Sequence, residues 1–483
     1  MARQYRSAFR KALAIGAVIG AALVVPIVDA LATSTYKLAR MDQPAAPIVE
    51  GEPMGKVRQP GKPVAVIIAS NRATEVTDFL PPFQMLSASG AFNVYVVTPE
   101  RAPATMYTGM MRPAGLSVVP DYSFAEYDAA VARAPDVIVI PYLPGFTPER
   151  DAPTLAWIRK HAGPATRLLS VCAGAEILAA TGLLDGHRAT ANLGGVSQYM
   201  KTYPRVRWQE GMRYVEDGRM MTSARLNAGI DATLAMIDRM AGREAALRAV
   251  RVTRYAHTAF LDEPQHRDPG IDVRGAVAAL LLNPRLPAVG VKLAPRVDEV
   301  ALAATLEFTG GSFARTLAFV AGDVPVQSRF GLTLLPSVTQ TDATRLDPIV
   351  TIPQAAEFGY DVVTRDLAHR KGELYAIVTA RNVNYIPDHL GLQASGWDWA
   401  WWRLLVDASL GAAVVWILIV YKGRRRNRRA IAPDSPAPAV EGHGSDADRI
   451  RTAHRNVDRA ADGTRSANNE LLSRGSSSSE ERL

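Results

Sequence analysis

Short apolar stretches alternate with longer amphipathic stretches through the first half of the chain. Four stretches have the composition of buried strands, at residues 63–70, 92–98, 115–120 and 136–141. Four others have the spacing of apolar positions that is typical of helices, at residues 77–89, 153–162, 229–240 and 243–255. Buried strands that alternate with helices predict an α/β fold with a mostly parallel sheet and helices on both faces. Such sheets bind ligands at the carboxyl ends of their strands.

Residues 168–178 carry the clearest candidate for chemistry. An apolar strand pattern leads into Cys172, and helical spacing begins again near Ile177. A sharp strand-to-helix turn would expose Cys172, with Ala173 and Gly174 leaving room for the turn and for a substrate. We expect the backbone amide of Ala173 to be available to an oxyanion, and the helix N-terminus to favour the thiolate of Cys172. A lone cysteine after an apolar strand is more often an inert core residue, which is the alternative interpretation.

A similar pattern returns in the second half of the chain. Residues 289–293 and 316–321 are predicted to be strands, and residues 297–308 a helix. The segment GLTLLP at 331–336 resembles GLSVVP at 115–120, and DPIVTIP at 347–353 resembles DVIVIP at 136–141. These matches predict a partial second α/β repeat that stops before any elbow, with chance similarity as the alternative. Residues 374–379 are predicted to be a further strand.

Two apolar segments lie near the ends of the chain, at residues 12–32 and 404–421, and a basic cluster flanks each of them. Both are long enough to suggest membrane-spanning helices, although the first also resembles a cleaved signal. Four tryptophans, at positions 397, 399, 401 and 402, have the character of an interfacial belt. The positive-inside rule then predicts a protein of the cell (inner) membrane, with its globular part outside the cytoplasm and its C-terminal tail inside.

These observations predict eight successive parts. They are a cytoplasmic basic end (1–11), an anchor or signal (12–32), a linker (33–60), an α/β domain (61–256), a connector (257–288), a partial second repeat (289–396), a transmembrane helix (404–421) and a basic, then disordered, tail (422–483).

The composition excludes several kinds of site. A single cysteine excludes an intrachain disulfide and a cysteine-based zinc site. The eight histidines show no paired ligand spacing, so we expect no metal and no cofactor. The net charge of +8 comes with basic clusters beside the two apolar segments, so we expect the lipid bilayer rather than a nucleic acid as partner. A small-molecule ligand and a homodimer are the other partners we expect.

Several motifs occur in the order of a known family. They are DFLPPF at 78–83, DVIVIP at 136–141, SVCAG at 170–174, GLLDGHRAT at 182–190, TSA at 222–224 and AGID at 228–231. Residues 63–255 resemble the ThiJ/PfpI family of the class I glutamine amidotransferase-like superfamily. They most resemble the branch that includes isonitrile hydratase and the N-terminal domains of AraC-type regulators. The resemblance implies a catalytic pair of Cys172 and Asp78, with Glu75 as a weaker candidate for the acid; a helix cap after Thr77 would also explain Asp78.

The chain departs from the family pattern at four positions around this pair. Ala173 replaces a threonine, serine or histidine, and Asn192 replaces a histidine. Gln84 replaces a glutamate, and Tyr142 follows Pro141 where the family has a glycine pair, with Gly145 coming later. The resemblance therefore implies a site lined by Ala173, Gly174, Tyr142, Gly145 and Asn192, with fewer polar groups than its relatives have.

Three functions remain open from the sequence. The first is a hydrolase or hydratase in which Cys172 attacks a small electrophile or an amide. The second is a catalytically degenerate ligand-binding or sensor module that signals across the membrane, which the four departures favour. The third is a transcription regulator, which follows from family analogy alone, and no helix-turn-helix pattern follows residue 255.

Overall fold

The structure is a computed structural model that describes residues 59–109, 111–192, 195–225, 227–263, 289–310, 316–320, 325–337, 349–352, 357–393 and 421. The chain divides into two compact units, residues 1–418 and 419–483. The helices and strands named below all belong to the first unit.

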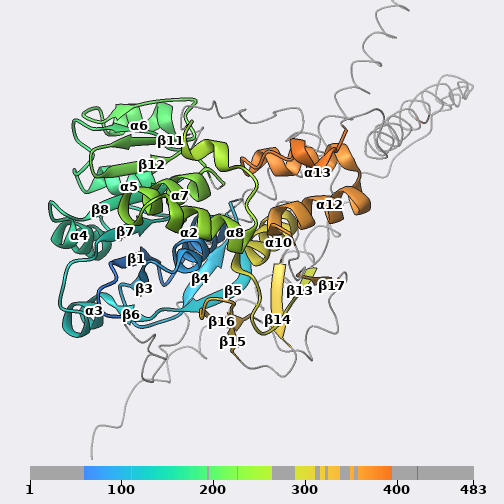
Figure 1. Ribbon diagram of the computed structural model, residues 1–483, viewed down its shortest axis with the longest axis horizontal. Helices are drawn as coiled ribbons and strands as arrows, with labels where there is room; N and C mark the ends of the chain where they lie inside the picture. The colour runs from blue at the N-terminus through green and yellow to red at the C-terminus, as the bar shows by residue number, and fades with distance from the viewer. Residues whose placement is uncertain are drawn as a thin grey trace, which may run out of the picture. The chain divides into compact units, whose positions relative to one another are not determined.

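A seven-stranded sheet is the centre of residues 62–261, with strand order β11-β12-β8-β7-β1-β3-β6 (Figure 1). Its strands are β1 (Val64–Ile68), β3 (Asn93–Thr98), β6 (Tyr122–Ser123), β7 (Val137–Ile140), β8 (Arg167–Val171), β11 (Tyr214–Asp217) and β12 (Met220–Ser223). All neighbours are parallel except β11 and β12. The predicted α/β fold with a mostly parallel sheet is confirmed.

Helices cover both faces of this sheet. They are α2 (Val76–Ser89), α3 (Phe124–Ala130), α4 (Ala152–His161), α5 (Gly174–Ala180), α6 (Val196–Thr202), α7 (Ala228–Ala241) and α8 (Arg243–Thr253), followed by a 3₁₀ turn, η1 (Thr258–Leu261). Strand β1 is buried throughout because alternate side chains enter two different cores. Ala65 and Ile67 join the core that includes α2, α7 and α8, and Val64, Val66 and Ile68 join the core under α4 and α5.

The start of α2 differs from the prediction. Its N-cap is Glu75, whose side chain accepts from the Asp78 amide, so Asp78 is not the cap. Pro81 and Pro82 lie inside the helix rather than marking its entry. Asp78 is thus available for a role other than capping.

Residues 289–393 form a second, smaller region. Strands β13 (Val289–Leu293), β14 (Thr316–Val320) and β17 (Ile349–Thr351) make a parallel sheet in the order β14-β13-β17. Helices α10 (Glu299–Gly310), α12 (Gly359–Lys371) and α13 (Glu373–Asn382) and the 3₁₀ turn η2 (Asp388–Leu390) complete it. The strand predicted at residues 374–379 is wrong, because this stretch lies within α13. Its short apolar run does not distinguish a strand from a buried helix face, and Ala376 and Ala380 on that face are fully buried.

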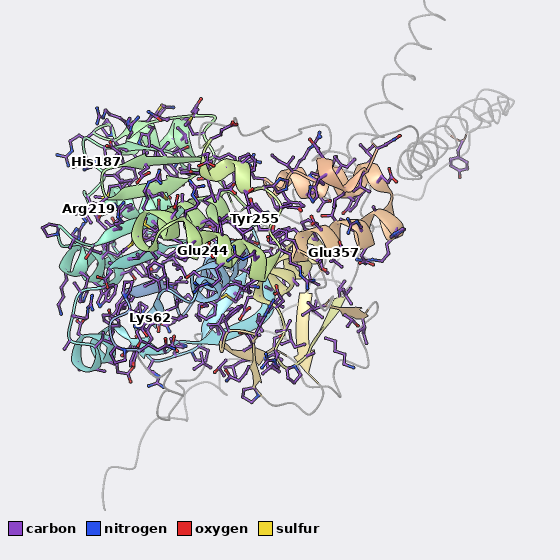
Figure 2. The ribbon with its side chains drawn as sticks, viewed as in Figure 1. Lys62, His187, Arg219, Glu244, Tyr255 and Glu357 are labelled. Carbon is purple, nitrogen blue, oxygen red and sulfur yellow. The ribbon has the colours of Figure 1, made fainter. Side chains whose placement is uncertain are left out.

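A five-stranded sheet joins the two regions. Its order is β15-β16-β5-β4-β2, from β2 (Thr74–Glu75), β4 (Ala104–Tyr107), β5 (Pro113–Val119), β15 (Val326–Gln327) and β16 (Thr333–Pro336). Strand β16 pairs antiparallel with β5, and α10 packs against α2. A separate pair of short strands, β9 (Arg188–Ala189) and β10 (Arg207–Trp208), lies outside these sheets. The side chains of Tyr255 and Phe358 also meet across the two regions, with ring centroids 5.1 Å apart. Figure 2 labels Tyr255, and also Glu357, which precedes Phe358 in the chain.

No helix within the described ranges is long and apolar enough to cross a membrane. The apolar segments predicted to do so, 12–32 and 404–421, lie outside the described residues except for Tyr421. The four tryptophans between 397 and 402, the basic clusters and the predicted tail also lie outside them.

Candidate functional site

Cys172 occupies the sharp corner that the sequence predicts. Strand β8 ends at Val171, Cys172 has a φ of 56°, and α5 begins at Gly174. A left-handed conformation costs a non-glycine residue roughly 1–2 kcal/mol, and such strain is concentrated at functional sites. The Cys172 amide donates to the Ser223 carbonyl at 3.1 Å, which ties the corner to β12.

Gly174 is required for this corner. A Cβ atom on Gly174 would lie 2.1 Å from the carbonyl oxygen of Ile140, at the end of β7. The space that we expected Gly174 to leave for a substrate is therefore occupied by backbone. Close packing of α5 on β7 holds Cys172 at the carboxyl end of the sheet.

Two acids from the start of α2 lie beside Cys172. Asp78 and Glu75 are both fully buried. Asp78 Oδ2 accepts from the Tyr142 amide at 3.1 Å, and the Glu75 amide donates to the Tyr142 carbonyl at 2.9 Å. Within the described residues, Asp78 Oδ1 and Glu75 Oε1 have no hydrogen-bond partner. The structure thus brings together the predicted pair and the weaker candidate acid.

The electrostatics of the thiol are opposite to our expectation. Burial raises the pKa of Cys172, and the neighbouring Asp78 and Glu75 raise it further. The Ala173 amide and the positive charge of Arg225 lower this pKa, but by less. Helix α5 has only seven residues, and the effect of its N-terminus is smaller than the cost of burying a thiolate beside two acids. The predicted thiolate-favouring environment is wrong.

The acids are also shifted toward their neutral forms. Burial raises the pKa of Asp78 to about 8, although the Tyr142 amide acts against this shift. Burial, followed by the charge of Asp78, raises the pKa of Glu75 well above its usual range. Near neutral pH both Cys172 and Asp78 therefore carry a proton.

The remaining predicted residues surround the corner at different distances. Burial raises the pKa of Tyr142 to about 12, with the charge of Cys172 adding to the shift, and the Gly145 backbone lies against Tyr142. Asn192 reaches the site through Tyr199, whose hydroxyl donates to Asn192 Oδ1 at 3.3 Å. Tyr142 and Ala173 adjoin the thiol directly, whereas Gly145 and Asn192 support the residues that do.

Sequence reasoning missed Glu176, Tyr199 and Arg225. Burial raises the pKa of Glu176, and the Tyr199 hydroxyl beside it counteracts the shift. Glu176 follows Cys172 by one helical turn, so its position was available in the sequence. Tyr199 and Arg225 lie on separate elements, and no local pattern indicated them.

The second region reaches the same acids. Glu307, on α10, accepts from the Gly109 amide at 2.9 Å, and its charge raises the pKa of both Asp78 and Glu75. Gln84, the residue that replaces the family glutamate, contacts the start of α10. It accepts from the Val300 amide at 2.6 Å and donates to Asp298 at 2.7 Å, so it caps α10.

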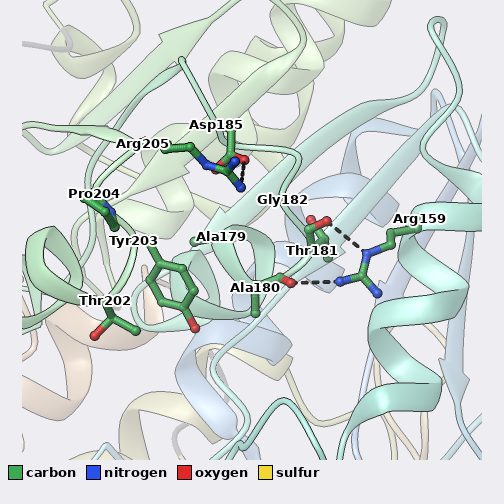
Figure 3. A pocket seen from close by; sticks show the side chains of 10 residues that line it. All are labelled: Arg159, Ala179, Ala180, Thr181, Gly182, Asp185, Thr202, Tyr203, Pro204 and Arg205. Atoms are coloured by element: carbon green, nitrogen blue, oxygen red, sulfur yellow. Dashed lines mark hydrogen bonds and ion pairs between the residues drawn. The ribbon is translucent and has the colours of Figure 1, made fainter.

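A surface pocket of about 420 Å³ lies at the other end of α5 (Figure 3). Arg159 on its wall donates to the carbonyls of Thr181 and Ala180, and Arg205 pairs with Asp185 at 2.6 Å. Cys172 is not among its lining residues. The described part of the chain contains no group of three or more histidine, cysteine or acidic side chains placed to hold a metal ion.

Comparison with solved structures gives similar folds with low superposition scores. Drosophila melanogaster DJ-1beta is 18% identical, with a TM-score of 0.35, over 41% of this chain and 100% of that one. A ThiJ/PfpI family protein from Pseudomonas syringae is 26% identical, with a TM-score of 0.35, over 44% of this chain and 83% of that one.

Sequence relatives share a higher identity with this chain than these two structures do. The regulator CdhR of Pseudomonas aeruginosa is 33% identical over 106 residues, which are 22% of this chain and 31% of that protein. Isonitrile hydratase of Pseudomonas putida is 30% identical over 170 residues, which are 35% of this chain and 68% of that protein. The model of the DJ-1/PfpI family matches residues 62–239, which include β1, the acids of α2 and the Cys172 corner. By sequence and by the placement of its single cysteine, this chain belongs to the DJ-1/PfpI family.

Proposed function

We propose that Cys172 and Asp78 add water to a small, uncharged, polarised carbon electrophile. The observation that carries the proposal is the fully buried acid Asp78 beside the half-buried thiol of Cys172 at the corner between β8 and α5, with the pKa of both groups raised by loss of solvent. An addition needs a nucleophile and a proton at the same site, and this pair supplies both. Similarity to isonitrile hydratase makes an isonitrile the first substrate to test.

The reaction balances without a cofactor. The Cys172 sulfur bonds to the terminal carbon of the isonitrile as Asp78 gives its proton to that carbon. Asp78 recovers a proton from the thiol, and the product of this step is a thioimidate. Water then adds to the thioimidate carbon, the carbon–sulfur bond breaks, and a formamide leaves with Cys172 again protonated.

The same geometry supports addition better than amide hydrolysis. An amide requires a strong nucleophile and donors for an oxyanion, whereas the pKa of Cys172 is raised and Ala173 has no hydroxyl. The Ala173 amide, which we expected to serve an oxyanion, acts instead on the thiol itself. A neutral electrophile also avoids burying another charge among Asp78, Glu75 and Glu307.

The test is formamide production by the full-length chain, followed by mass spectrometry. We expect turnover by the unmodified protein and a loss of at least about 100-fold in Cys172→Ser and in Asp78→Asn. Glu244→Gln, a substitution of an exposed acid on α8, should retain the rate. Absence of formamide, or equal rates in all variants, would contradict the proposal.

A ligand-binding module is the second candidate, and the raised pKa of the Cys172 thiol favours it. In that case the protein would bind a small neutral molecule without turnover, and bound ligand would protect Cys172 from alkylation. The regulator hypothesis gains only the partial match to CdhR.

We also propose the membrane placement that the apolar segments 12–32 and 404–421 and their basic flanks support. A cysteine introduced at Ser395 in a Cys172→Ser background should react with an impermeant reagent in intact cells. Reaction only after lysis would contradict an extracytoplasmic globular part.

A further inference from the structure

Residues 289–393 repeat part of the framework of residues 62–261. The sheet order β14-β13-β17 matches β3-β1-β7, and the strands are parallel in both. The sequence Arg-x-x-Glu-Val occurs at the start of both α2 and α10, at residues 72–76 and 296–300. The second region thus contains the counterpart of the helix that carries Asp78.

The repeat continues into the helix pairs. Gly229 and Asp231 near the start of α7 correspond to Gly359 and Asp361 near the start of α12. In each region a tyrosine 24 residues after the aspartate, Tyr255 or Tyr385, donates its hydroxyl to that aspartate. The second region is therefore more than the first half of a unit, because it also has the closing helices.

The two copies contact each other through equivalent elements. In the antiparallel pairing of β5 with β16, Val118 lies opposite Leu334, its own counterpart in the aligned segments GLSVVP and GLTLLP. On either side, Leu335 lies opposite Ser117 and Thr333 opposite Val119. Helix α2 likewise packs against α10. Contact of each element with its own equivalent is the property of a two-fold symmetric dimer interface.

We propose that residues 289–393 are a built-in second subunit, and that Glu307 of this subunit completes the buried acid cluster beside Cys172. Glu307 is 4% exposed, and its carboxylate holds the Gly109 amide. Two residues on, Met111 Sδ accepts from the Tyr142 hydroxyl at 3.5 Å, and Tyr142 adjoins the thiol. Glu307 is a positioning residue in this arrangement, and its role rests on the proposed function of Cys172 and Asp78.

The buried polar groups of the cluster come from both subunits. The Tyr360 hydroxyl, from α12, lies close to Thr77 and Asn227 but has no hydrogen-bond geometry to any described partner. The titratable groups that interact with Asp78 are Glu75, Tyr142, Cys172 and Glu307. Arg225 interacts with Cys172, and Tyr360 interacts with Glu75 and Glu307. Of the acids in this set, Glu307 alone comes from the second subunit.

The single cysteine allows a direct test. The alkylation rate of Cys172, measured by mass spectrometry across pH, should rise, flatten near pH 8 as Asp78 ionises and repels the thiolate, and then rise again. Glu307→Gln keeps an acceptor for Gly109 but removes a like charge, so the flattening should move to lower pH by about half a unit or more. Glu299→Gln is the matched control, since Glu299 is an equally buried acid on the same helix that instead accepts from Ser328 and Phe330.

The pH profile of Cys172 alkylation in Glu307→Gln should differ from that of the unmodified protein. The profile of Glu299→Gln should match that of the unmodified protein. Superposition of all three, with circular dichroism showing folded protein, would overturn the role of Glu307. Because the readout is alkylation and not turnover, this outcome is separate from failure of the proposed function.

A cross-linking measurement keeps the proposal testable if Glu307→Gln does not fold. In a full-length Cys172→Ser background, Ser117→Cys with Leu335→Cys should form one disulfide within a single chain, because these residues are directly opposed and half-buried. Ser117→Cys with Leu334→Cys should not, because neighbouring side chains point to opposite faces. Cross-links between chains, or none in the first pair, would overturn the built-in subunit.

Discussion

The two repeats share one layer of the fold and differ in the other. Helices α2, α7 and α8 of the first region and α10, α12 and α13 of the second contribute to a single continuous core. The core on the opposite face of the large sheet contains residues only from Val64 to Met220. In the first region residues 141–227 connect β7 to α7 and include Cys172, whereas residues 352–358 connect β17 to α12. Within the described ranges, the layer that forms the contact between the repeats occurs twice and the layer that holds the elbow occurs once.

The paired aspartates give the largest expected difference between the repeats. Asp231 forms an ion pair with Arg213 at 2.6 Å, and both side chains are 1% exposed. Among the described residues no arginine forms an ion pair with Asp361, which instead pairs with His389, whose side chain is 33% exposed. We expect Asp231→Asn to lower the free energy of unfolding by about 3–5 kcal/mol, because it leaves Arg213 buried with less compensation.

Urea unfolding of the two variants measures this contrast. Asp361→Asn should cost about 1–2 kcal/mol, since it removes hydrogen bonds without leaving a buried charge. Equal losses of unfolding free energy in Asp231→Asn and Asp361→Asn would show that the buried charge of Arg213 does not make the first aspartate more important for stability. Arg213 also bonds Asn384 at 3.0 Å, so the first variant should weaken contact between the repeats as well.

Sequence patterns predicted most of the first repeat because its strands are continuous apolar runs and its helices are amphipathic. They also placed Cys172 at a corner, whereas the position of Asp78 near it followed from the family resemblance. They gave the wrong direction for the thiol pKa, because burial and the joint effect of Asp78 and Glu75 depend on packing. The part played by Glu307 depends on contact with residues about two hundred positions earlier, and nothing local to α10 indicates it.

The buried acid Glu299 of α10 should make the free energy of unfolding depend on pH. Burial raises the pKa of Glu299 to about 7 in the folded protein, above its unfolded value of about 4.5. The folded state therefore holds more protons on Glu299 between these values, so the contribution of Glu299 to stability is greatest below about pH 4.5 and falls as pH rises toward 7. We expect Glu299→Gln to flatten this fall and to raise stability above pH 7 by on the order of 1–3 kcal/mol, as measured by urea unfolding across pH. An unchanged slope would contradict a neutral, buried Glu299.

The equivalent glycines give a smaller contrast. A Cβ on Gly359 would lie 2.6 Å from the backbone of Ala301, whereas one on Gly229 would lie 2.5 Å from a side-chain methyl of Val171. Backbone yields less readily than a side chain, so Gly359→Ala should destabilise the protein more than Gly229→Ala, within about 1–3 kcal/mol for each. Thermal unfolding of both variants would show the order, and a larger loss in Gly229→Ala would reverse the argument.

The central claim is that the elbow of the first repeat holds a protonated thiol beside a protonated acid. Ultraviolet absorbance of the thiolate tests it directly, because Cys172 is the only cysteine and Cys172→Ser supplies the blank. We expect the folded protein to show thiolate only at pH values above the range of an ordinary thiol, and Asp78→Asn to move this transition to lower pH. A thiolate already formed at neutral pH in the folded protein would contradict the account.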